Sequence, residues 1–221
     1  MRGKSLLHLQ CHFGLDTLNW ARLGARVTGA DFSDEAIATA RDLAREVELD
    51  ANFVCANIYD LPHALDEKFD IVFTSHGVLS WLPDLVAWAR VVAHFLKPGG
   101  LFFIAEGHPT AYIFDDAYMD GLEVRYAYFH SEAPGMSEVH GSYADRDADA
   151  QGVEYWWTFG IGDVINALIG AGLHIEELRE YPFVSWQMLP VMEQDADGWW
   201  RLPNRFPQLP LMFSLRARAK L

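Results

Sequence analysis

The sequence predicts an α/β fold built on a mostly parallel sheet, and three observations carry this prediction. Short apolar runs bounded by turn residues alternate with segments of helical periodicity along much of the chain. The clearest unit, residues 6–32, reads in the order strand, turn, helix, strand, which places two parallel strands side by side. The chain has 221 residues, 51% of them hydrophobic, which supports one domain with a large core.

Residues 6–32 also predict a crevice that binds a ligand. Residues 6–9 are a short apolar run that favours a strand. Asp16 and Thr17 then open a helix, and Gly24 ends it. The turn between this strand and this helix lies at the carboxyl end of the strand, where open α/β sheets bind their ligands.

Gly14 and Asp31 favour a nucleoside in this crevice. Gly14 has no Cβ, so backbone and ligand can approach closely in the turn. The second strand, residues 25–30, delivers Asp31 to its carboxyl end, where a carboxylate can accept hydrogen bonds from two ribose hydroxyls. The arrangement therefore predicts an adenosine-type ligand.

The turn itself distinguishes two classes of cofactor. A dinucleotide site uses G-x-G-x-x-G, so that a pyrophosphate can lie against bare backbone at the helix N-terminus. Residues 10–14 read QCHFG, and the bulky Gln10 and His12 occupy places where a diphosphate needs bare backbone. Nicotinamide or flavin binding is disfavoured, and a nucleoside without phosphates fits better.

At these positions the chain resembles the class I S-adenosylmethionine-dependent methyltransferases. Their first motif usually runs hydrophobic-Asp-x-Gly-x-Gly-x-Gly, and their second strand ends in the acid that binds ribose. Gly14 and Asp31 match this pattern, whereas His8 stands where the family often has Asp. Gln10 and His12 replace the first two glycines. The resemblance implies that S-adenosylmethionine is the cofactor.

Later segments follow the order of the same family. After a third strand at residues 52–56, Asn57 stands where an Asp or Asn commonly bonds the adenine amino group, and Ile58 where an apolar side chain covers the ring. Residues 69–75, of the F-D-x-V type, predict a fourth strand that ends at the mouth of the site. The cofactor-binding residues that the resemblance implies are Gln10, His12, Gly14, Asp31, Phe32, Asn57, Ile58 and Ser75.

A family junction follows the fourth strand. A helix over about residues 84–96 closes with the KPGG sequence at 97–100, before a strand at 101–105. The resemblance is close over residues 6–106 and fainter in the last third of the chain. It implies a Rossmann-like three-layer sandwich with a mostly parallel seven-stranded sheet. Its antiparallel last strand, residues 212–219, is expected between the fifth and sixth strands.

Two segments depart from this pattern within the single methyltransferase domain expected over residues 1–221. At about 107–155 the helix and strand periodicities fade, and about 182–210 is rich in aromatic residues and proline. We expect both segments to cover the substrate, with a dimer contact as the alternative for the second. The Asp-rich run at 145–149 predicts a solvated loop, because it lacks the glycine and closing Glu of a calcium loop.

Two histidines are candidate catalytic bases. His76 and His108 follow the fourth and fifth strands, and a histidine with a near-neutral pKa is the usual base for a hydroxyl or protonated amine. Tyr112 is a candidate orienting hydroxyl. The alternative for each histidine is that it fills a polar loop or bonds the backbone. His8, Cys11 and His12 lack a second ligand pair at zinc spacing, so no metal is expected.

Composition restricts the partners. The formal charge of −14 repels phosphate backbones and no basic cluster offsets it, so a small molecule is favoured over nucleic acid as the substrate. No apolar run is long enough to span a membrane and no signal peptide is seen. Two cysteines suit free thiols in a reducing compartment, so a cytoplasmic location is expected. A homodimer is left open.

Together these observations predict S-adenosylmethionine-dependent methyl transfer to an oxygen or nitrogen of a small molecule. One alternative is a protein that binds S-adenosylmethionine or S-adenosylhomocysteine without transfer, and a weaker one is a nicotinamide-dependent oxidoreductase. The family normally has N-terminal helices over the cofactor, whereas residues 1–4 are all that precede the first strand. We expect either an upstream start or another segment or subunit to cover the site.

Overall fold

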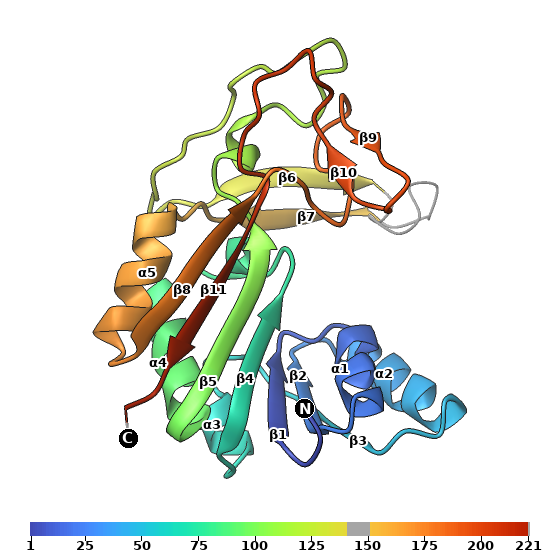
Figure 1. The fold of residues 1–221 in the computed structure, drawn as a ribbon, viewed down its shortest axis with the longest axis vertical. Helices are drawn as coiled ribbons and strands as arrows, with labels where there is room; N and C mark the ends of the chain where they lie inside the picture. The colour runs from blue at the N-terminus through green and yellow to red at the C-terminus, as the bar shows by residue number, and fades with distance from the viewer. Residues whose placement is uncertain (141–150, 221) are drawn as a thin grey trace.

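The computed structural model describes residues 1–140 and 151–220, and its centre is a seven-stranded sheet (Figure 1). The strand order is β3-β2-β1-β4-β5-β11-β8. All pairs from β3 to β5 are parallel, and β11 is antiparallel to both of its neighbours. The predicted sheet, with its antiparallel last strand in an inner position, is confirmed. Its strands are β1 (Ser5–Leu9), β2 (Arg26–Asp31), β3 (Ala51–Cys55), β4 (Phe69–Ser75), β5 (Leu96–Gly107), β8 (His174–Tyr181) and β11 (Met212–Arg218).

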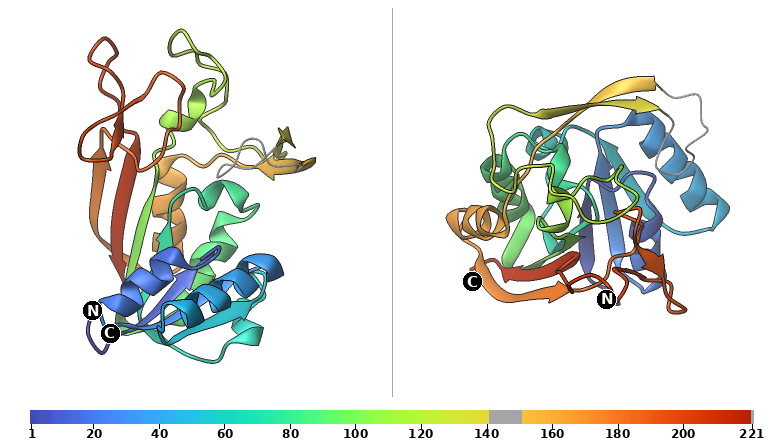
Figure 2. Two further views of the ribbon diagram at one scale, coloured as in Figure 1. Left: turned by 90° about the vertical axis from the view of Figure 1, so that its right-hand side faces the viewer. Right: turned by 90° about the horizontal axis from the view of Figure 1, so that it is seen from above.

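Helices lie on both faces of the sheet, which gives the predicted three layers (Figures 1 and 2). On one face α1 and α2 pack against β2 and β3. On the other face α4 and α5 pack against the strands from β4 to β8, with the short α3 beside α4. The helices are α1 (Leu15–Arg22), α2 (Asp34–Glu46), α3 (Leu61–Ala64), α4 (Leu85–Phe95) and α5 (Ile161–Gly170).

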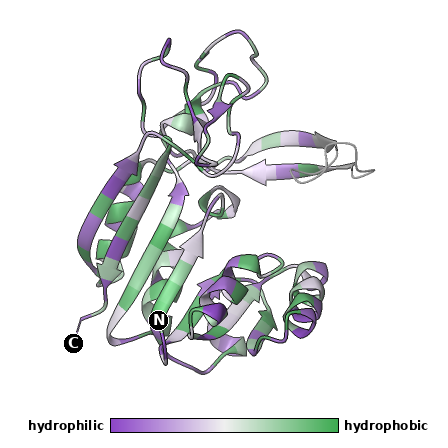
Figure 3. Ribbon diagram, turned by 45° about the vertical axis from the view of Figure 1, so that its right-hand side comes forward, coloured by the Kyte–Doolittle hydropathy of each residue, from purple (hydrophilic) through white to green (hydrophobic). Residues whose placement is uncertain are grey.

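The alternation of side chains along β1 shows why two layers of helices are needed. Leu6 packs with Val27 and Phe73 on the α1 face, whereas its neighbour Leu7 belongs to the large core under α4 and α5. A strand buried on both faces carries a continuous apolar run, which is the pattern that residues 6–9 gave in the sequence. Apolar residues dominate the central strands, and polar residues interrupt the edge strand β8 (Figure 3).

Side-chain caps fix where the two longest helices begin. Ser33 Oγ accepts a hydrogen bond from the Ala36 backbone N–H at 3.1 Å at the start of α2. Asp84 Oδ1 accepts one from the Ala87 N–H at 2.8 Å at the start of α4. Each cap satisfies a backbone donor that has no partner inside the helix. The loops that precede these helices are therefore held at defined positions at the edge of the sheet.

The junction after α4 differs in part from the prediction. The helix ends at Phe95 as expected, but β5 already begins at Leu96, so the KPGG segment lies within the strand. Leu96 pairs with Phe69, and the register then shifts. Gly99, with φ of 71°, donates its backbone N–H to the Lys220 carbonyl at 3.2 Å, and its carbonyl accepts from the Arg218 guanidinium at 2.9 Å, so it is tied to the C-terminal strand region. Tertiary pairing has thus extended the strand through a sequence that normally breaks structure.

The predicted insertion contains strands that the sequence did not reveal. β6 (Gly135–His140) and β7 (Gln151–Trp156) form an antiparallel hairpin in which Ser137 pairs with Glu154 and Met136 with Tyr155. Both strands mix polar and apolar residues without a clean alternation, so the period-2 signal was absent. The Asp-rich run at 145–149 lies outside the described residues.

The insertion also packs against the C-terminal segment. Ala111, in the short helix η2 (Ala111–Ile113), shares a buried apolar cluster with residues of the 182–210 segment, which carries the small strands β9 (Glu193–Gln194) and β10 (Trp200–Arg201). Both segments rise above the carboxyl ends of β4 and β5 (Figure 1). No helix in the described part of the chain has the length and apolar character needed to cross a bilayer. The fold thus places both segments at the carboxyl-end edge of the sheet, and their role as a substrate cover stays a prediction.

The glycine in the first turn gives a test of this packing. Gly14 has φ of 81°, and a Cβ there would lie 2.7 Å from the ring of buried Phe53. Gly198 has φ of 85° but open space around it. We expect Gly14→Ala to lower the free energy of unfolding by about 3 kcal/mol, because it adds a clash to the backbone strain. Gly198→Ala is the control and should cost about 1 kcal/mol. Urea unfolding checks both, and equal losses would contradict this account.

Candidate active site

The turn between β1 and α1 has an unusual backbone. Gln10, His12 and Gly14 all have positive φ, at 56°, 51° and 81°. The first two are not glycine, and a left-handed conformation costs such residues about 1–2 kcal/mol each. The turn therefore keeps a path normally built from glycines, although Gln and His occupy two of the three places.

Asp31 holds this turn in place. Its Oδ2 accepts a hydrogen bond from the His12 backbone N–H at 2.8 Å, and its Oδ1 accepts one from the Ser33 N–H at 3.0 Å. The side chain is only 9% exposed. A carboxylate has about four acceptor positions, so both oxygens can accept further donors from a ligand. Asp31 is thus both a structural link between two loops and an available acceptor.

Gly14 has a different role from the one expected. The space where its Cβ would lie is filled by Phe53 and by Ala40, not by open crevice. Its small size lets the turn pack on the core beneath it. Contact between Gly14 and a ligand stays a prediction.

A cavity of about 340 Å³ lies beside Asp31, and we call it the Asp31 cavity. It includes five of the eight residues predicted to bind the cofactor, whereas His12, Gly14 and Ser75 are not among its lining residues. Its walls also contain residues that the sequence did not single out, chiefly from η1 (Leu79–Trp81) and the loop after it. The lining residues are Leu9, Gln10, Ala30, Asp31, Phe32, Ala56, Asn57, Ile58, Tyr59, Leu61, Trp81, Leu82 and Pro83.

Polar atoms are few in the Asp31 cavity. Gln10 Nε2 donates to the Val78 carbonyl at 3.2 Å, while Gln10 Oε1 is buried and has no hydrogen-bond partner among the described residues. Asn57 Oδ1 accepts from the Tyr59 backbone N–H at 3.0 Å, which leaves its amide N–H₂ as a donor. Phe32 is 74% exposed at the rim. An apolar cavity with a few aimed polar groups is typical of small-molecule sites.

A buried hydrogen-bonded network lies under the turn. His8 Nδ1 is 2.8 Å from Thr17 Oγ1, and His8 Nε2 is 3.1 Å from Ser75 Oγ. Burial lowers the pKa of His8 to about 4, with a smaller raising effect from Asp16. A neutral imidazole therefore occupies the position where the family that the sequence resembles often has an Asp carboxylate. Ser75, predicted to bind cofactor, is held in this network.

Glu106, at the end of β5, is a functional candidate that the sequence analysis missed. Its carboxylate is 2% exposed and accepts hydrogen bonds from four backbone N–H groups, those of Gly77, Val78, Leu79 and Gly107. Burial raises its pKa, and these donors oppose that shift. In the sequence, Glu106 is a single acid at the end of an apolar strand, and nothing near it in the chain indicates which groups its carboxylate contacts.

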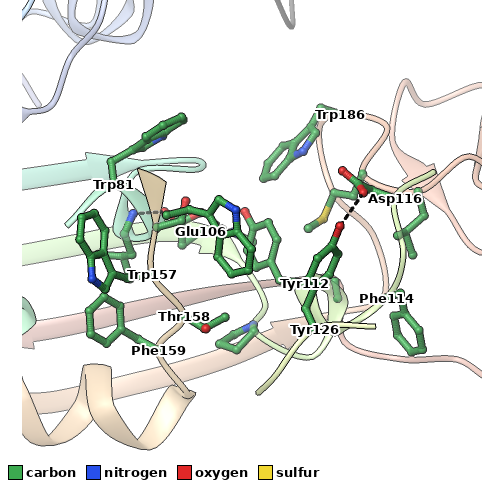
Figure 4. A pocket seen from close by; sticks show the side chains of 18 of the residues that line it. Trp81, Glu106, Tyr112, Phe114, Asp116, Tyr126, Trp157, Thr158, Phe159 and Trp186 are labelled. Carbon is green, nitrogen blue, oxygen red and sulfur yellow. Dashed lines mark hydrogen bonds between the residues drawn. The ribbon is translucent and has the colours of Figure 1, made fainter. Parts of the chain in front are cut away.

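A second cavity, of about 330 Å³, is lined in part by the 107–155 and 182–210 segments (Figure 4). We call it the aromatic cavity. Trp81 lines both cavities, so the two spaces share a wall. The backbone N–H of Trp157 donates to the Ser80 carbonyl at 2.9 Å and ties this wall to the segment after β7. Side chains that line it include Trp81, Glu106, Tyr112, Phe114, Asp116, Tyr126, Glu154, Trp156, Trp157, Phe159, Trp186 and Phe213.

Tyr112, expected to be an orienting hydroxyl, lies in this aromatic cavity beside Glu106. Burial, together with the charge of Glu106 and a hydrogen bond to its carboxylate, raises the pKa of Tyr112 well above its usual value. Tyr112 therefore stays protonated near neutral pH and acts as a hydrogen-bond donor.

The two histidines proposed as bases lie in different environments. His76 is exposed, its ring lies 5.6 Å edge-on from that of Trp186, and desolvation lowers its pKa while Asp16 opposes the shift. His108 is 3% exposed and lines neither cavity. Its Nδ1 accepts from the Thr110 N–H at 3.1 Å, and its Nε2 lies 2.9 Å from Glu180 Oε1 on β8. The structure thus brings His76 near the aromatic cavity and His108 to a buried structural position.

No group of three or more His, Cys, Asp or Glu side chains gathers in a metal-binding arrangement within the described residues.

The buried His8 should make stability depend on pH. Its pKa falls from 6.5 in the unfolded chain to about 4 in the fold, so its contribution is full above pH 6.5 and is lost as the pH falls to 4. We expect protonation of His8 to lower the free energy of unfolding by roughly 3 kcal/mol as the pH falls from 6.5 to 4. Urea unfolding at several pH values measures the effect. The His8→Asn variant should lose less stability over the same window, and an equal pH dependence would contradict this role.

The two thiols should react very differently. Cys11 is 4% exposed and burial raises its pKa to about 12, whereas Cys55 is exposed. Because the thiolate is the reactive form, iodoacetamide at pH 8 should label only Cys55 in the folded protein. Mass spectrometry should show one modification when folded and two in urea. Cys55→Ser is the control and should stay unlabelled when folded; labelling of Cys11 at a similar rate would refute the expectation.

The first part of the chain matches a known protein family. Residues 7–104 match the model of a methyltransferase domain. The chain is 32% identical over 116 residues to a ubiquinone biosynthesis O-methyltransferase of Alkalilimnicola ehrlichii, covering 52% of this chain and 47% of that protein. A protein of the same name from Neisseria meningitidis is 32% identical over 117 residues, covering 51% and 49%. The chain thus spans about half the length of the curated relatives it matches.

Solved structures extend the likeness to the whole fold. An S-adenosylmethionine-dependent methyltransferase from Mesorhizobium loti has a TM-score of 0.67 at 22% identity, covering 98% of this chain and 91% of its own. The glycopeptide N-methyltransferase MtfA in complex with S-adenosylmethionine has a TM-score of 0.61 at 18% identity, covering 99% and 82%. Residues 7–104 therefore match a methyltransferase domain, and the chain has the fold of solved S-adenosylmethionine-dependent methyltransferases.

Proposed function

We propose that this protein transfers a methyl group from S-adenosylmethionine to an oxygen or nitrogen of a small molecule. The observation that carries the proposal is the pair of cavities that share Trp81 at the carboxyl ends of the parallel strands. One cavity has the Asp31 carboxylate, and the other is lined in part by the 107–155 and 182–210 segments. The names of the relatives, an O-methyltransferase and an N-methyltransferase, support both kinds of acceptor atom.

The residues of the Asp31 cavity fit an adenosine. Asp31 would accept the two ribose hydroxyls on the lone pairs that the backbone leaves free. Ile58 and Phe32 would hold the adenine ring, and the Asn57 side chain would bond its edge. Gln10 Oε1, a buried acceptor without a described partner, takes a donor from the cofactor. His12, Gly14 and Ser75 lie outside this lining and act from the turn and the end of β4.

The protein contributes mainly alignment and exclusion of water. When bound, S-adenosylmethionine supplies an electrophilic methyl group on a sulfonium. The shared wall at Trp81 would orient the acceptor atom toward the cofactor in the Asp31 cavity. The segments at 107–155 and 182–210, within one domain over 1–221, close over the acceptor and keep water out. Glu106 fixes the loop between the cavities by holding its backbone N–H groups.

His76 is the base that we propose for the proton of the acceptor. Desolvation lowers its pKa, so its ring is neutral near pH 7 and can accept a proton. Its contact with Trp186, which lines the aromatic cavity, gives it a position at the cavity edge. His108 is not carried into this mechanism, because both of its ring nitrogens face protein groups.

The other expectations from composition stay predictions. They comprise a cytoplasmic location, action on a small molecule without nucleic acid or membrane, and a homodimer contact. The nicotinamide alternative gains no support from the turn, whose left-handed positions carry Gln10 and His12 side chains.

Asp31 provides the test of the proposed function. We expect Asp31→Ala to weaken S-adenosylmethionine binding by at least about a hundredfold, because the ribose hydroxyls lose a charged acceptor. Calorimetric titration measures the affinity, and circular dichroism checks that the fold survives loss of the two backbone hydrogen bonds. Asp31→Asn is the matched variant, and it should keep the turn while still losing most of the affinity.

Unchanged affinity in both Asp31 variants would overturn the assignment. Stabilisation of the wild-type protein by NAD but not by S-adenosylmethionine, measured by thermal shift, would favour the oxidoreductase. Binding without any methylated product in a screen of hydroxyl and amine acceptors would favour the binding-only alternative.

A further inference from the structure

The charge of the aromatic cavity is of one sign. Its lining includes the carboxylates of Glu106, Asp116 and Glu154, whereas no Lys, Arg or His side chain is among the residues that line it. Glu106 is buried, Glu154 is half-buried and Asp116 is exposed, and together with the aromatic rings around a cavity of about 330 Å³ these acids raise the local negative potential. An anionic acceptor would be repelled from this space, and a cationic one would be attracted.

The aromatic walls also favour a positively charged ligand. A cation is attracted to the faces of Trp, Tyr and Phe rings, most strongly to Trp, and the attraction grows where water is excluded. Four tryptophans line this cavity, contributed by η1, the end of β7 and the C-terminal segment. They are Trp81, Trp156, Trp157 and Trp186.

The cavity has two chemically distinct ends (Figure 4). Trp81 and Trp157 lie at one end, where the wall is shared with the Asp31 cavity, and Asp116 and Tyr126 lie at the other. Tyr126 donates its hydroxyl hydrogen to Asp116 Oδ1 at 3.3 Å. The reacting atom of an acceptor must be at the Trp81 end, so Asp116 faces a part of the acceptor that does not react.

Glu154 lies toward the Tyr126 end of the cavity. The Trp156 ring contacts the Tyr126 ring at 5.4 Å and its Nε1 donates to Ser137 Oγ at 3.1 Å, and Ser137 pairs with Glu154 on β7. Both Ser137 and Glu154 line the cavity. Burial and then the charge of Asp116 raise the pKa of Glu154, in keeping with two carboxylates that line the same cavity. Arg125 pairs with Asp115 at 3.0 Å and its charge also acts on Asp116, but it is exposed and is not part of the lining. Within the cavity itself no cationic side chain is among the lining residues, so a ligand would supply the positive charge there.

We propose that the acceptor is a small aromatic or apolar molecule with a protonated amine, bound with its ammonium group at Asp116 and Glu154 and its methyl-accepting atom at the Trp81 end. This inference rests on the proposed function, because it takes the aromatic cavity as the acceptor site. The ammonium is a recognition group, so the atom that receives the methyl group is a second one, at the opposite end of the acceptor.

Three probes of the same shape but different charge test this selection. Tyramine has an ammonium and a phenol at opposite ends, tyrosol replaces the ammonium with a hydroxyl, and 4-hydroxyphenylacetate replaces it with a carboxylate. Binding is measured by quenching of tryptophan fluorescence and by calorimetry at pH 7.5, without cofactor. We expect tyramine to bind at least about tenfold more tightly than tyrosol, and 4-hydroxyphenylacetate to bind most weakly.

Matched variants test whether Glu154 and Asp116 bind the ammonium group of tyramine. Glu154→Gln and Asp116→Asn should each reduce tyramine affinity several-fold and leave tyrosol affinity nearly unchanged. Glu138→Gln is the control: it removes one negative charge from the same hairpin, but Glu138 follows Ser137 on β6, is exposed and is not in the lining. The Glu138→Gln variant should prefer tyramine over tyrosol by the same factor as the wild-type protein.

The outcomes separate this inference from the proposed function. If tyramine shows no advantage over tyrosol, whether both bind or neither does, or if the advantage survives in both acid variants, the inference is wrong. S-adenosylmethionine titration is run on the same protein samples. Cofactor binding without an amine preference would overturn the inference alone, whereas an amine preference without cofactor binding would overturn the proposed function.

Discussion

Two buried carboxylates that accept backbone hydrogen bonds fix the loops on which the site depends. Asp31 holds the turn after β1, and Glu106 holds the loop after β4 through the N–H groups of three consecutive residues. A buried backbone donor without a partner costs about 1–3 kcal/mol, so each acid removes a large penalty from an irregular segment. Both cavities are built on these loops, and their shared wall at Trp81 follows from that anchoring.

The first turn keeps a left-handed path at two positions that are not glycine. Gln10 and His12 accept left-handed backbone, and the strain is offset by the hydrogen bond from His12 to Asp31 and by the bond from Gln10 to the Val78 carbonyl. Beneath the turn, neutral His8 bonds the hydroxyl groups of Thr17 and Ser75. The turn is stable without glycine at positions 10 and 12 because neighbouring groups supply hydrogen-bond partners to Gln10, His12 and His8.

The acceptor side of the site is built from segments far apart in the chain. Trp81 follows β4, Tyr112 and Asp116 come from the insertion, Glu154 lies on β7, and Trp186 comes from the C-terminal segment. None of these belongs to a motif with fixed spacing, so local pattern could not group them. The packing of the insertion against the C-terminal segment brings these residues together, so that acidic and aromatic side chains line one cavity.

The sequence by itself determined the sheet, its helices and the position of Asp31, because hydrophobic periodicity, caps and turn glycines act over a few residues. It also identified five residues of the Asp31 cavity, since they follow strands that end at one edge. Only the tertiary structure revealed Glu106, separated His76 from His108 and drew β5 through the KPGG segment. These depend on contacts between distant segments, where burial and hydrogen-bond partners decide what each side chain does.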